Sequence, residues 1–586
     1  MENTIKQITI NALRDLYQTE INLEQVKLEP TNSDFKGDFT LLTFPFLRHS
    51  KKNPEQTAHE LGAYIVEKIS EIESYNVVKG FLNLEINPSY WVNKLLEVNC
   101  NIANSTHQKV MVEYSSPNTN KPLHLGHVRN NLLGYSVAEI LKKSGNEVYK
   151  INLINDRGIH ICKSMLAWQL FGNNETPESA QMKGDHLVGK YYVIFDKAYK
   201  TEVSELVNQG VQQEQAEKQA PLILKAQEML RKWESGDAEV IQLWKTMNEW
   251  VYAGFESTYK ELGVNFDRFY YESNTYQLGK DNIEEGLAKG VFYRKPDQSV
   301  WIDLTEDGLD HKLVLRSDGT SVYITQDIGT ALLKYQDYHC DKSIYVVGNE
   351  QDYHFKVLFL ILKKLGYSWS NGCYHLSYGM VDLPSGKMKS REGTVVDADD
   401  LISEMIETAK VKTEELGKTE GLSDEEKQQL FRMLGLGALK FYMLKVDPQK
   451  RMLFNPQESI DFQGDTGPFV QYAFARITSM LKAAKQLNQE IAFKSVEVSS
   501  SEIALIKTLV NYPLEVGKAA QSYSPAVIAH YSLELAKAFN RVYNDVPFLR
   551  EKDDSKRSFR LFLASKTADI IQDALALLGI DCPERM

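Results

Sequence analysis

The pattern of apolar and polar residues separates a region of alternating strands and helices from a region that is helical. Between Val110 and about Asp400, short apolar runs typical of buried strands alternate with longer stretches of helical spacing. This alternation predicts a doubly wound α/β domain on a parallel sheet. The predicted strands cover residues 110–112, 148–151, 312–315, 322–324, 343–347 and 378–381.

Three other segments have different patterns. Residues from about 172 to 263 are rich in charge and helical in spacing, which predicts a helical insertion between the two halves of the α/β domain. The first hundred residues mix helical and strand patterns on a smaller scale. From Leu401 onward the spacing is helical almost throughout, and residues 397–400 supply the N-cap of the first helix.

Together these patterns predict a multidomain fold that is α/β in its first two domains and all-α in its last. A Rossmann-like, doubly wound parallel-sheet domain carries the helical insertion, follows a small N-terminal α/β domain and precedes a C-terminal helical bundle. The predicted domain boundaries are 1–108, 109–400 with the insertion at about 172–263, and 401–586.

A polar loop joins the predicted strand at residues 110–112 to a helix, and its sequence contains a candidate nucleotide site. Such a junction directs free N–H groups and the positive end of the helix at anions. Gly126 leaves room for a base or ribose against the backbone, and His124 and His127 can donate hydrogen bonds to phosphate oxygens. A four-residue pattern such as His124 to His127 also arises by chance, so the interpretation as two structural histidines is equally good.

A second candidate element is a cationic loop far along the chain. Lys387, Lys389 and Arg391 lie between the turn residues Pro384-Ser385-Gly386 and the break at Gly393. Such a loop can close over a triphosphate and neutralise the departing pyrophosphate. Alone, a charge run of this kind is more often a solvated surface loop. The two elements in this order favour an ATP site that activates a carboxylate by adenylation.

The longer run Ser115-Ser116-Pro117-Asn118-Thr119-Asn120-Lys121-Pro122-Leu123-His124-Leu125-Gly126-His127 resembles the nucleotide-binding signature of class I aminoacyl-tRNA synthetases, specifically the arginyl-tRNA synthetase family. The resemblance covers nearly the whole chain. It implies ATP as a substrate, with Mg²⁺ on its phosphates, and transfer of L-arginine to tRNA(Arg). The implied catalytic residues are Lys121, His124, His127, Lys387, Lys389 and Arg391, and the implied ATP-binding residues are His124, Gly126, His127, Met388 and Ser390.

The second signature departs from the common Lys-Met-Ser-Lys-Ser. Here Lys389 takes the third position and Ser390 the fourth, so the fourth-position lysine is absent. The family resembled often lacks this lysine and carries one just before the first signature, a role that Lys121 fits. The separate duties of the three cations in the second signature stay open.

A pocket for arginine requires planar anionic partners, because a guanidinium group carries five donors and no acceptor. The resemblance places Glu272 and Asp327 on the guanidinium group, with Tyr323, expected on a strand, beside it. It places Asn152 and Gln351 on the amino-acid end. Taken singly, Asp327 reads equally well as a helix N-cap and Glu272 as a surface acid. The implied arginine-binding residues are Ser116, Asn118, Asn152, Glu272, Tyr323, Asp327 and Gln351.

Aromatic and cationic residues are interleaved in two C-terminal helical segments, at 461–476 and 536–543. They can stack on unpaired bases and hold phosphates, although most of the rings are expected in a helical core. The segments resemble the anticodon-binding domain of the family, which implies tRNA contact by Tyr472, Arg476, Asn540, Tyr543 and Met586.

The N-terminal domain resembles the domain of the family that contacts the tRNA elbow. The alternative is that it only adds stability.

Composition changes this picture little. The net charge of −12 argues against a nucleic-acid partner, but a basic groove can exist on an acidic protein. Five scattered cysteines without Cys-x-x-Cys spacing predict a cytoplasmic protein with no structural zinc and no metal-ligating residues. The apolar runs are too short to span a bilayer, and the resemblance implies a monomer.

Two other functions fit parts of the sequence. The first is an adenylating enzyme with a small-molecule acceptor. The N- and C-terminal regions argue against this function, because a small acceptor needs no appendages of RNA size. The second is a tRNA-binding regulatory protein that has lost catalysis, against which both signatures speak.

Overall fold

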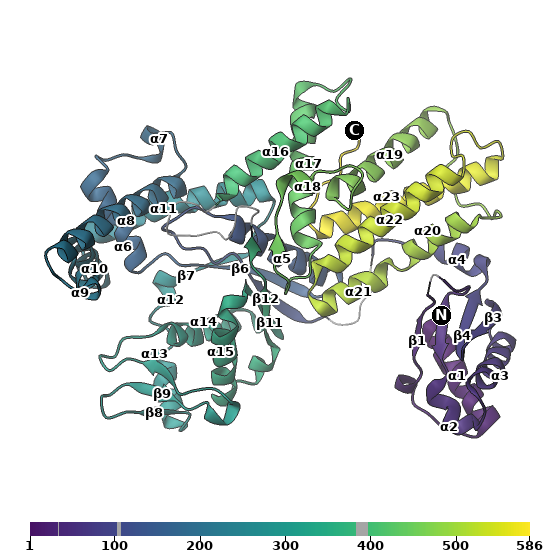
Figure 1. Ribbon diagram of the computed structural model, residues 1–586, viewed down its shortest axis with the longest axis horizontal. Coiled ribbons are helices and arrows are strands. Elements are labelled where there is room, and N and C mark those ends of the chain that lie inside the picture. The colour runs from purple at the N-terminus through teal and green to yellow at the C-terminus, as the bar shows by residue number, and fades with distance from the viewer. Residues whose placement is uncertain (33, 102–106, 383–395) are drawn as a thin grey trace. The chain divides into compact units, whose positions relative to one another are not determined.

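The computed structural model describes residues 1–586 except 33, 102–106 and 383–395 (Figure 1). The chain forms two compact units. One contains residues 1–99, 484–511 and 538–567, and the other contains residues 100–483, 512–537 and 568–586.

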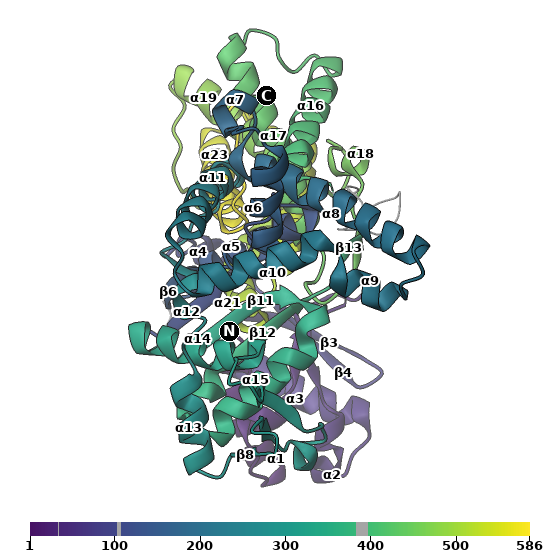
Figure 2. The same ribbon diagram turned by 90° about the vertical axis from the view of Figure 1, so that its left-hand side faces the viewer.

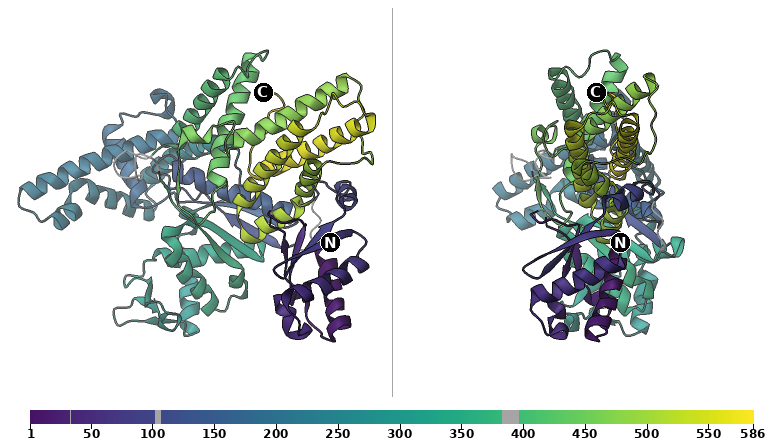
Figure 3. Two further views of the ribbon diagram at one scale, coloured as in Figure 1. Left: turned by 45° about the vertical axis from the view of Figure 1, so that its right-hand side comes forward. Right: turned by 90° about the vertical axis from the view of Figure 1, so that its right-hand side faces the viewer.

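The N-terminal part of the first unit, purple in Figure 3, is a four-stranded antiparallel sheet packed against helices, with strand order β1–β2–β4–β3. Ile5 and Leu13 from α1 and Leu61 from α3 pack with Leu41 and Leu82 of the sheet in one core. The elements are α1 (Glu2–Tyr17), η1 (Leu23–Gln25), β1 (Leu28–Pro30), β2 (Phe39–Leu42), η2 (Phe44–Phe46), α2 (Leu47–Ser50), α3 (Pro54–Lys68), β3 (Ile72–Val78), β4 (Phe81–Ile86) and α4 (Pro88–Leu95).

Within the first unit, α4 packs against α20 (Ser500–Val510). Lys507 of α20 pairs with the nearly buried carboxylate of Asp38, which also accepts a hydrogen bond from the Ile86 backbone at 2.8 Å. Asp38 therefore has a structural role. Contact of this domain with the tRNA elbow stays a prediction.

The second unit is built on a five-stranded parallel sheet of order β12–β11–β5–β6–β7. Because the strand order reverses at β5, right-handed crossovers place the helices that follow β5 and β11 on opposite faces, which confirms the doubly wound prediction. The carboxyl ends of β5 and β11 form the switch point. The strands are β5 (Lys109–Glu113), β6 (Glu147–Ile154), β7 (Arg268–Tyr271), β11 (Lys342–Gly348) and β12 (Cys373–Tyr378).

One face of this sheet packs against α14 and α15. Met111, Ile151 and Tyr345 point to this face and contact Phe355 and Phe359 of α15 in a shared core. Helix α5, between β5 and β6, packs against β5, β6 and β11. The helices around the sheet are α5 (Leu125–Lys143), α12 (Glu272–Thr275), α13 (Lys280–Ala288), α14 (Tyr323–Tyr338) and α15 (Asp352–Lys364), with η4 (Asn349–Gln351) and η5 (Ser368–Gly372).

The predicted insertion is helical, as Figure 2 shows around α8 and α10. Its long helix α8 packs against α6 and α11. The helices are α6 (Ile159–Phe171), α7 (Pro177–Ala180), α8 (Gly184–Asn208), α9 (Gln213–Gln219), α10 (Pro221–Glu234) and α11 (Ala238–Leu262).

Three predicted strands need correction. Residues 322–324 are the N-cap and first turn of α14, where the Thr325 hydroxyl accepts the Val322 N–H at 3.2 Å. Residues 312–315 form β10 of a separate antiparallel sheet with β8 (Phe292–Arg294) and β9 (Val300–Ile302), beside η3 (Thr305–Asp307). At 378–381, β12 ends at Tyr378, and β13 (Val381–Asp382) pairs with β14 (Met452–Leu453).

The chain after residue 397 is mainly helical, as predicted. The Asp397 carboxylate accepts hydrogen bonds from the Asp399 and Asp400 backbones and so caps α16. The remaining helices are α16 (Ala398–Glu415), α17 (Asp424–Leu444), α18 (Pro456–Ser459), α19 (Gly467–Gln486), α21 (Tyr512–Ser522), α22 (Pro525–Asp545) and α23 (Asp554–Leu577). Within the described ranges, no helix combines the length and apolar character that crossing a membrane requires.

Candidate functional site

The first signature follows β5 and starts α5, at the switch point of the parallel sheet. His124 is the N-cap, and its Nδ1 accepts the Gly126 N–H at 3.2 Å. The Nδ1 of His127 accepts the His124 N–H, also at 3.2 Å, and the two ring centroids lie 3.9 Å apart. Because both Nδ1 atoms accept, each neutral ring carries its proton on Nε2, where it can be donated to a ligand.

The two histidines are uncharged at neutral pH. Burial, helped by the charge of Lys121, lowers the pKa of His124 to about 4. Burial, followed by the charges of His124 and Lys121, brings the pKa of His127 well below its ordinary value. Burial also lowers the pKa of Lys121. The signature therefore presents neutral N–H donors beside one amine.

The loop between β5 and the signature has an unusual backbone. Ser115 and Ser116 adopt positive φ angles of 75° and 44°, which non-glycine residues rarely adopt. The Ser115 N–H donates to Asn130 at 2.5 Å, and the Ser116 N–H donates to Asn152 at 3.1 Å. The Tyr259 hydroxyl bonds both Ser115 and Asn152, at 2.7 and 3.1 Å. Buried side chains thus hold the strained loop, and Asn152 faces it.

The second signature lies outside the described residues, because it falls within 383–395; this applies to the predicted Lys387, Met388, Lys389, Ser390 and Arg391.

Both flanks of this segment are held near the first signature. On one side, the fully buried Arg129 donates to the carbonyls of Gly379 at 2.7 Å and Lys450 at 3.0 Å. On the other side, the Leu125 N–H donates to Val396 at 3.1 Å and the Ala398 N–H to Leu123 at 3.0 Å. Helix α5 and the residue before its N-cap therefore hold described residues on both sides of the segment 383–395.

A cavity of about 540 Å³ opens beside the strained loop. Its lining includes Asn118, Glu272 and Tyr323, three of the predicted arginine-binding residues. Burial raises the pKa of Glu272 to about 7, against the nearby charge of Arg157, and the carboxylates of Asp156 and Asp327 add to the rise. Among the described residues, Glu272 has no cationic side chain within ion-pair distance. The cavity thus contains a carboxylate whose ionisation needs a cation.

Glu272 begins the short helix α12, and Asp156 fixes that helix in place. The buried Asp156 carboxylate accepts the Ser273 N–H at 2.8 Å, the Ser273 hydroxyl at 2.7 Å and the Tyr252 hydroxyl at 2.9 Å. The Trp244 indole also donates to the Asp156 carbonyl at 2.7 Å, so these bonds together tie the segment after β6 to α11 and α12.

The other predicted arginine-binding residues lie elsewhere around the same sheet edge. Asp327 sits in the second turn of α14, so it is not the N-cap, and its carboxylate contacts the His354 Nε2 at 2.6 Å. Tyr323 is the first helical residue of α14 and is 73% exposed. Ser116 and Gln351 are exposed, and Asn152 is buried beneath the loop. The direct ligand role of these residues stays a prediction.

A second cavity, of about 810 Å³, is lined by residues of the first signature and by residues of α8 in the insertion. Lys121 and His124 line one side. Lys163, Lys190 and Lys200 line other parts of its wall. The amine of Lys121 therefore lies at the border of a space with several cations.

The predicted RNA-contacting residues divide between the two units. In the second unit, Tyr472 of α19 lies between two cations, with the Lys418 ammonium 3.3 Å and the Arg476 guanidinium 4.7 Å from its ring centroid. In the first unit, the ring of Tyr543 on α22 is 39% exposed and stacks on Phe548, whereas Asn540 is partly buried. Met586 is partly exposed.

Sequence reasoning missed several residues that shape the site. Arg129 and Asp156 act through partners that are distant in sequence, because Trp244 lies 88 residues from Asp156 and Gly379 lies 250 residues from Arg129. Tyr259 and Lys418 carried no local signal, because each acts only through contacts that folding brings together.

Comparison with known proteins identifies the family. The family model described as tRNA synthetases class I (R), catalytic domain, matches residues 92–455. The arginyl tRNA synthetase N terminal domain matches residues 3–86, and the DALR anticodon binding domain matches residues 470–586.

Relatives and solved structures agree with these matches. An arginine–tRNA ligase of Flavobacterium psychrophilum is 56% identical and covers 98% of each chain. The arginine–tRNA ligase of Bacteroides thetaiotaomicron is 53% identical over 100% of each chain. The solved arginyl-tRNA synthetase of Thermus thermophilus superposes with a TM-score of 0.81 at 25% identity over 100% of each chain. The chain therefore belongs to the arginyl-tRNA synthetase family of class I enzymes.

Proposed function

We propose that this protein activates L-arginine with ATP and transfers the arginyl group to the 3′ end of tRNA(Arg). The observation that carries the proposal is the pair of neutral histidines, His124 and His127. Each can donate its Nε2–H at the switch point of the parallel sheet, in a chain of the arginyl-tRNA synthetase family. The arginine carboxylate attacks the α-phosphorus and pyrophosphate leaves. The terminal ribose hydroxyl of the tRNA then attacks the adenylate carbonyl, loses its proton and displaces AMP as the leaving group.

The chain's contribution to the first step is positioning and charge stabilisation. His124 and His127 donate to phosphate oxygens, Gly126 lets the nucleotide approach the backbone, and Lys121 supplies the cation. Mg²⁺ accompanies the triphosphate as part of the substrate. The predicted contributions of Lys387, Met388, Lys389, Ser390 and Arg391 complete the set.

The cavity beside the strained loop is the proposed arginine pocket. Its carboxylate, Glu272, is partly desolvated and lacks a cationic partner among the described side chains, which suits a guanidinium group. Asp327 supplies a second carboxylate and Tyr323 a neighbouring ring. Ser116, Asn118, Asn152 and Gln351 complete the proposed arginine set, Asn152 by holding the loop.

Arginine affinity is expected to fall as the pH decreases through about 7. Glu272 has a raised pKa of about 7 in the empty pocket, so acid protonates it and removes the charge that attracts the guanidinium group. Binding at pH 6 is therefore expected to be about tenfold weaker than at pH 8. Isothermal titration with arginine at both pH values measures this. The Glu272→Gln variant should lose the dependence, and an affinity that rises in acid would contradict the assignment.

The proposed RNA contacts are Tyr472, Arg476, Asn540, Tyr543 and Met586. Arg476→Gln is expected to weaken tRNA(Arg) binding about tenfold and to reduce the slope of log affinity against log salt concentration by about one, because one phosphate contact is lost. Filter binding across a salt series measures both quantities. Lys485→Gln, which removes one exposed charge from the same helix, is the matched control. If Arg476→Gln and Lys485→Gln have equal effects, Arg476 contributes only through its charge and not through a specific phosphate contact.

The proposed domain boundaries are 1–108, 109–400 and 401–586. The five cysteines are all free thiols, which supports a cytoplasmic protein, and a monomer is proposed from the family resemblance.

The deciding experiment is ATP–pyrophosphate exchange with each of the twenty amino acids, with and without unfractionated tRNA. Exchange with arginine supports the proposal, and its response to tRNA shows whether RNA completes the site. Exchange with a different amino acid contradicts the assignment of Glu272 and Asp327. If tRNA is bound but no amino acid supports exchange, the regulatory function is favoured. If arginine is activated but not transferred to tRNA, the small-acceptor function is favoured.

A further inference from the structure

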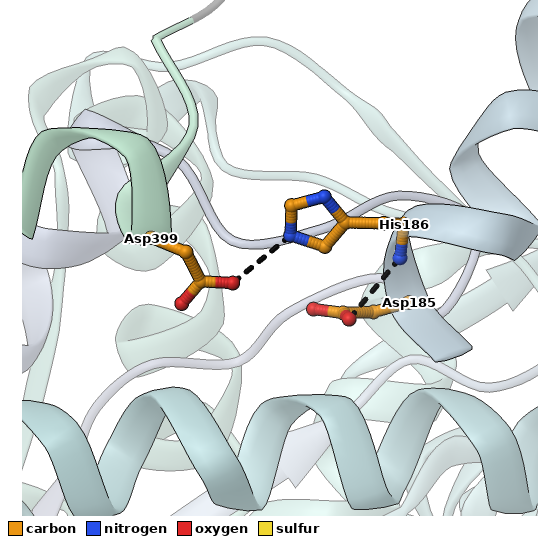
Figure 4. A group of neighbouring side chains, drawn as sticks. All are labelled: Asp185, His186 and Asp399. Carbon is orange, nitrogen blue, oxygen red and sulfur yellow. Dashed lines mark hydrogen bonds and ion pairs between the residues drawn. The ribbon is translucent and has the colours of Figure 1, made fainter. Parts of the chain in front are cut away.

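A cluster of charged side chains joins the helical insertion to the end of the second signature segment. Figure 4 shows His186, at the start of α8, between Asp399 of α16 and the neighbouring Asp185. The His186 Nε2 contacts an Asp399 carboxylate oxygen at 2.9 Å. The Lys183 ammonium contacts the same oxygen at 2.5 Å. The Thr258 hydroxyl of α11 donates to the other Asp399 oxygen at 2.9 Å.

The charges in this cluster are only partly balanced. Three carboxylates, Asp185, Asp397 and Asp399, face Lys183 and His186, and the side chain of Asp185 is 0% exposed. The hydrogen bond to Asp399 raises the pKa of His186, against the effect of burial. Burial alone would raise the pKa of Asp399, but the bonds from His186 and Lys183 hold it well below its usual range. When it is protonated, His186 therefore bridges the two helices as a second cation.

Asp397 and Asp399 begin α16 directly beside the first signature. A β-bridge joins His124 to Asp397, and the backbones of Leu123 and Leu125 bond the residues on either side of it. A displacement of the α16 N-terminus therefore moves two things together: the backbone of the catalytic histidines and the point where residues 383–395 end.

Helix α8 also contacts the signature loop directly. A Cβ atom added at Gly189 would lie 2.8 Å from the Pro122 ring, so the helix backbone packs closely on the loop that carries Lys121. The insertion thus contacts the first signature at Gly189. Through Lys183 and His186 it also contacts Asp399 of α16.

A metal ion is the other chemistry that this cluster suggests, because ligand atoms of Asp185, His186 and Asp399 all lie within 4.8 Å of one another. Lys183 already occupies the position of the cation, since its ammonium lies 2.5 Å from Asp399 and 3.6 Å from Asp185. The amine neutralises the same oxygens that a metal would need. The geometry therefore favours an ion-pair network over a metal site.

We propose that Lys183 and His186 are positioning residues for adenylation, which hold the N-terminus of α16 against the backbone of the first signature. The proposal rests on the proposed function, because it assigns the network to the ATP reaction. Neither side chain needs to touch a substrate.

The test measures kcat and KM in ATP–pyrophosphate exchange for His186→Ala, His186→Gln and Lys183→Met. His186→Ala and Lys183→Met are expected to lower kcat about tenfold or more, because small displacements of reacting groups are costly, while the Kd for arginine stays unchanged. The Gln side chain can still donate to Asp399 but carries no charge, so His186→Gln is expected to recover only the rate that the wild type keeps when His186 is neutral. Lys197→Met, which removes an exposed charge from the same helix, is the control.

The pH profile separates positioning from a purely structural role. In the wild type, loss of the His186 proton weakens the bridge to Asp397 and Asp399, so kcat is expected to fall as the pH rises through the raised pKa of His186. The charged groups that face His186 are Lys183 and Asp185 at the start of α8 and Asp397 and Asp399 at the start of α16, and burial raises the pKa of both Asp185 and Asp397. His186→Gln should remove this limb of the profile, because its amide does not titrate.

Three outcomes would overturn the proposal. The first is kcat within twofold of wild type in all variants, the second a lower melting temperature with unchanged kinetics and pH profile, and the third a rate that a zinc-selective chelator abolishes in excess Mg²⁺ and that Zn²⁺ restores. A wild-type protein without arginine-dependent exchange would instead refute the proposed function, so the two failures are distinguishable.

Discussion

Glu272→Gln is expected to remove nearly all arginine-dependent exchange at pH 8 while leaving the fold intact. The substitution keeps the size of the side chain and replaces an anion with a neutral amide. Loss of one partner in a buried charge pair costs on the order of 2–5 kcal/mol, which corresponds to a fall of about 30-fold to several thousandfold in kcat/KM for arginine. No other substitution in the proposed pocket is expected to act so strongly without disturbing a neighbour.

The reason for choosing Glu272 over Asp327 lies in their surroundings. Asp327 pairs with His354 at 2.6 Å, so its removal also releases a histidine. Glu272 has a raised pKa because of burial, and in the empty pocket its ionisation is opposed by the surroundings. Such a group destabilises the folded state as the pH rises above the ordinary carboxyl pKa toward 7. Glu272→Gln should therefore melt no lower than wild type at pH 8, although its activity collapses.

The measurement is arginine-dependent exchange across a wide arginine range, together with thermal unfolding at pH 8. Glu284→Gln is the matched control, because Glu284 is exposed and makes only a long ion pair with Arg294 at 3.3 Å. A Glu272→Gln protein that exchanges normally shows that the guanidinium group binds elsewhere. A protein that loses activity only because it melts early gives no support to the pocket either.

The parts of this molecule that follow from the sequence are those with local signals. The strand, polar loop and helix around His124 are specified by residues within thirty positions of one another, and the structure forms them as predicted. The apolar run at Val322, which contains β-branched residues, led to a wrong prediction of a strand at 322–324. The Thr325 hydroxyl caps the backbone there, and a helix begins instead. Local propensity was outweighed by a single side-chain hydrogen bond.

The candidate site was predictable in composition but not in arrangement. The resemblance implies that Asn152 contacts arginine, which stays a prediction; the structure adds that its carboxamide oxygen accepts the Ser116 N–H and that its amide donates to the Tyr259 hydroxyl. The clamp made by Arg129 depends on carbonyls more than 200 residues away, in a loop without any motif. Such contacts exist only once the chain has folded, so a sequence pattern contains no trace of them.

Lys121→Met is expected to lower kcat for arginine activation by about 10²–10³-fold, with little change in the Kd for arginine. Lys121 lies before the first signature, and the family resemblance assigns it the duty of the missing lysine of the second. Burial lowers its pKa in the empty site, so the ammonium is poorly solvated there. A triphosphate restores the missing countercharge, and the negative charge that develops on the α-phosphoryl oxygens in the transition state strengthens the interaction further.

The position of Lys121 explains why it should act on rate more than on binding. It lines the same cavity wall as His124, and its charge helps to keep that histidine neutral. Methionine retains most of the length and apolar character of the side chain, so packing against α8 should persist. His124 then loses a cationic neighbour, and its pKa should rise toward the ordinary histidine value.

Single-turnover adenylation, arginine titration and the pH profile of the variant test this account together. Lys142→Met, which removes an exposed charge near the end of α5, the helix that follows the signature loop, controls for net charge. A rate within threefold of wild type would mean that one of the cations at 387–391 performs the duty of the absent lysine. A slow variant with normal arginine binding would place that duty on Lys121, because the charge removed is the one facing the phosphates while the arginine pocket is untouched.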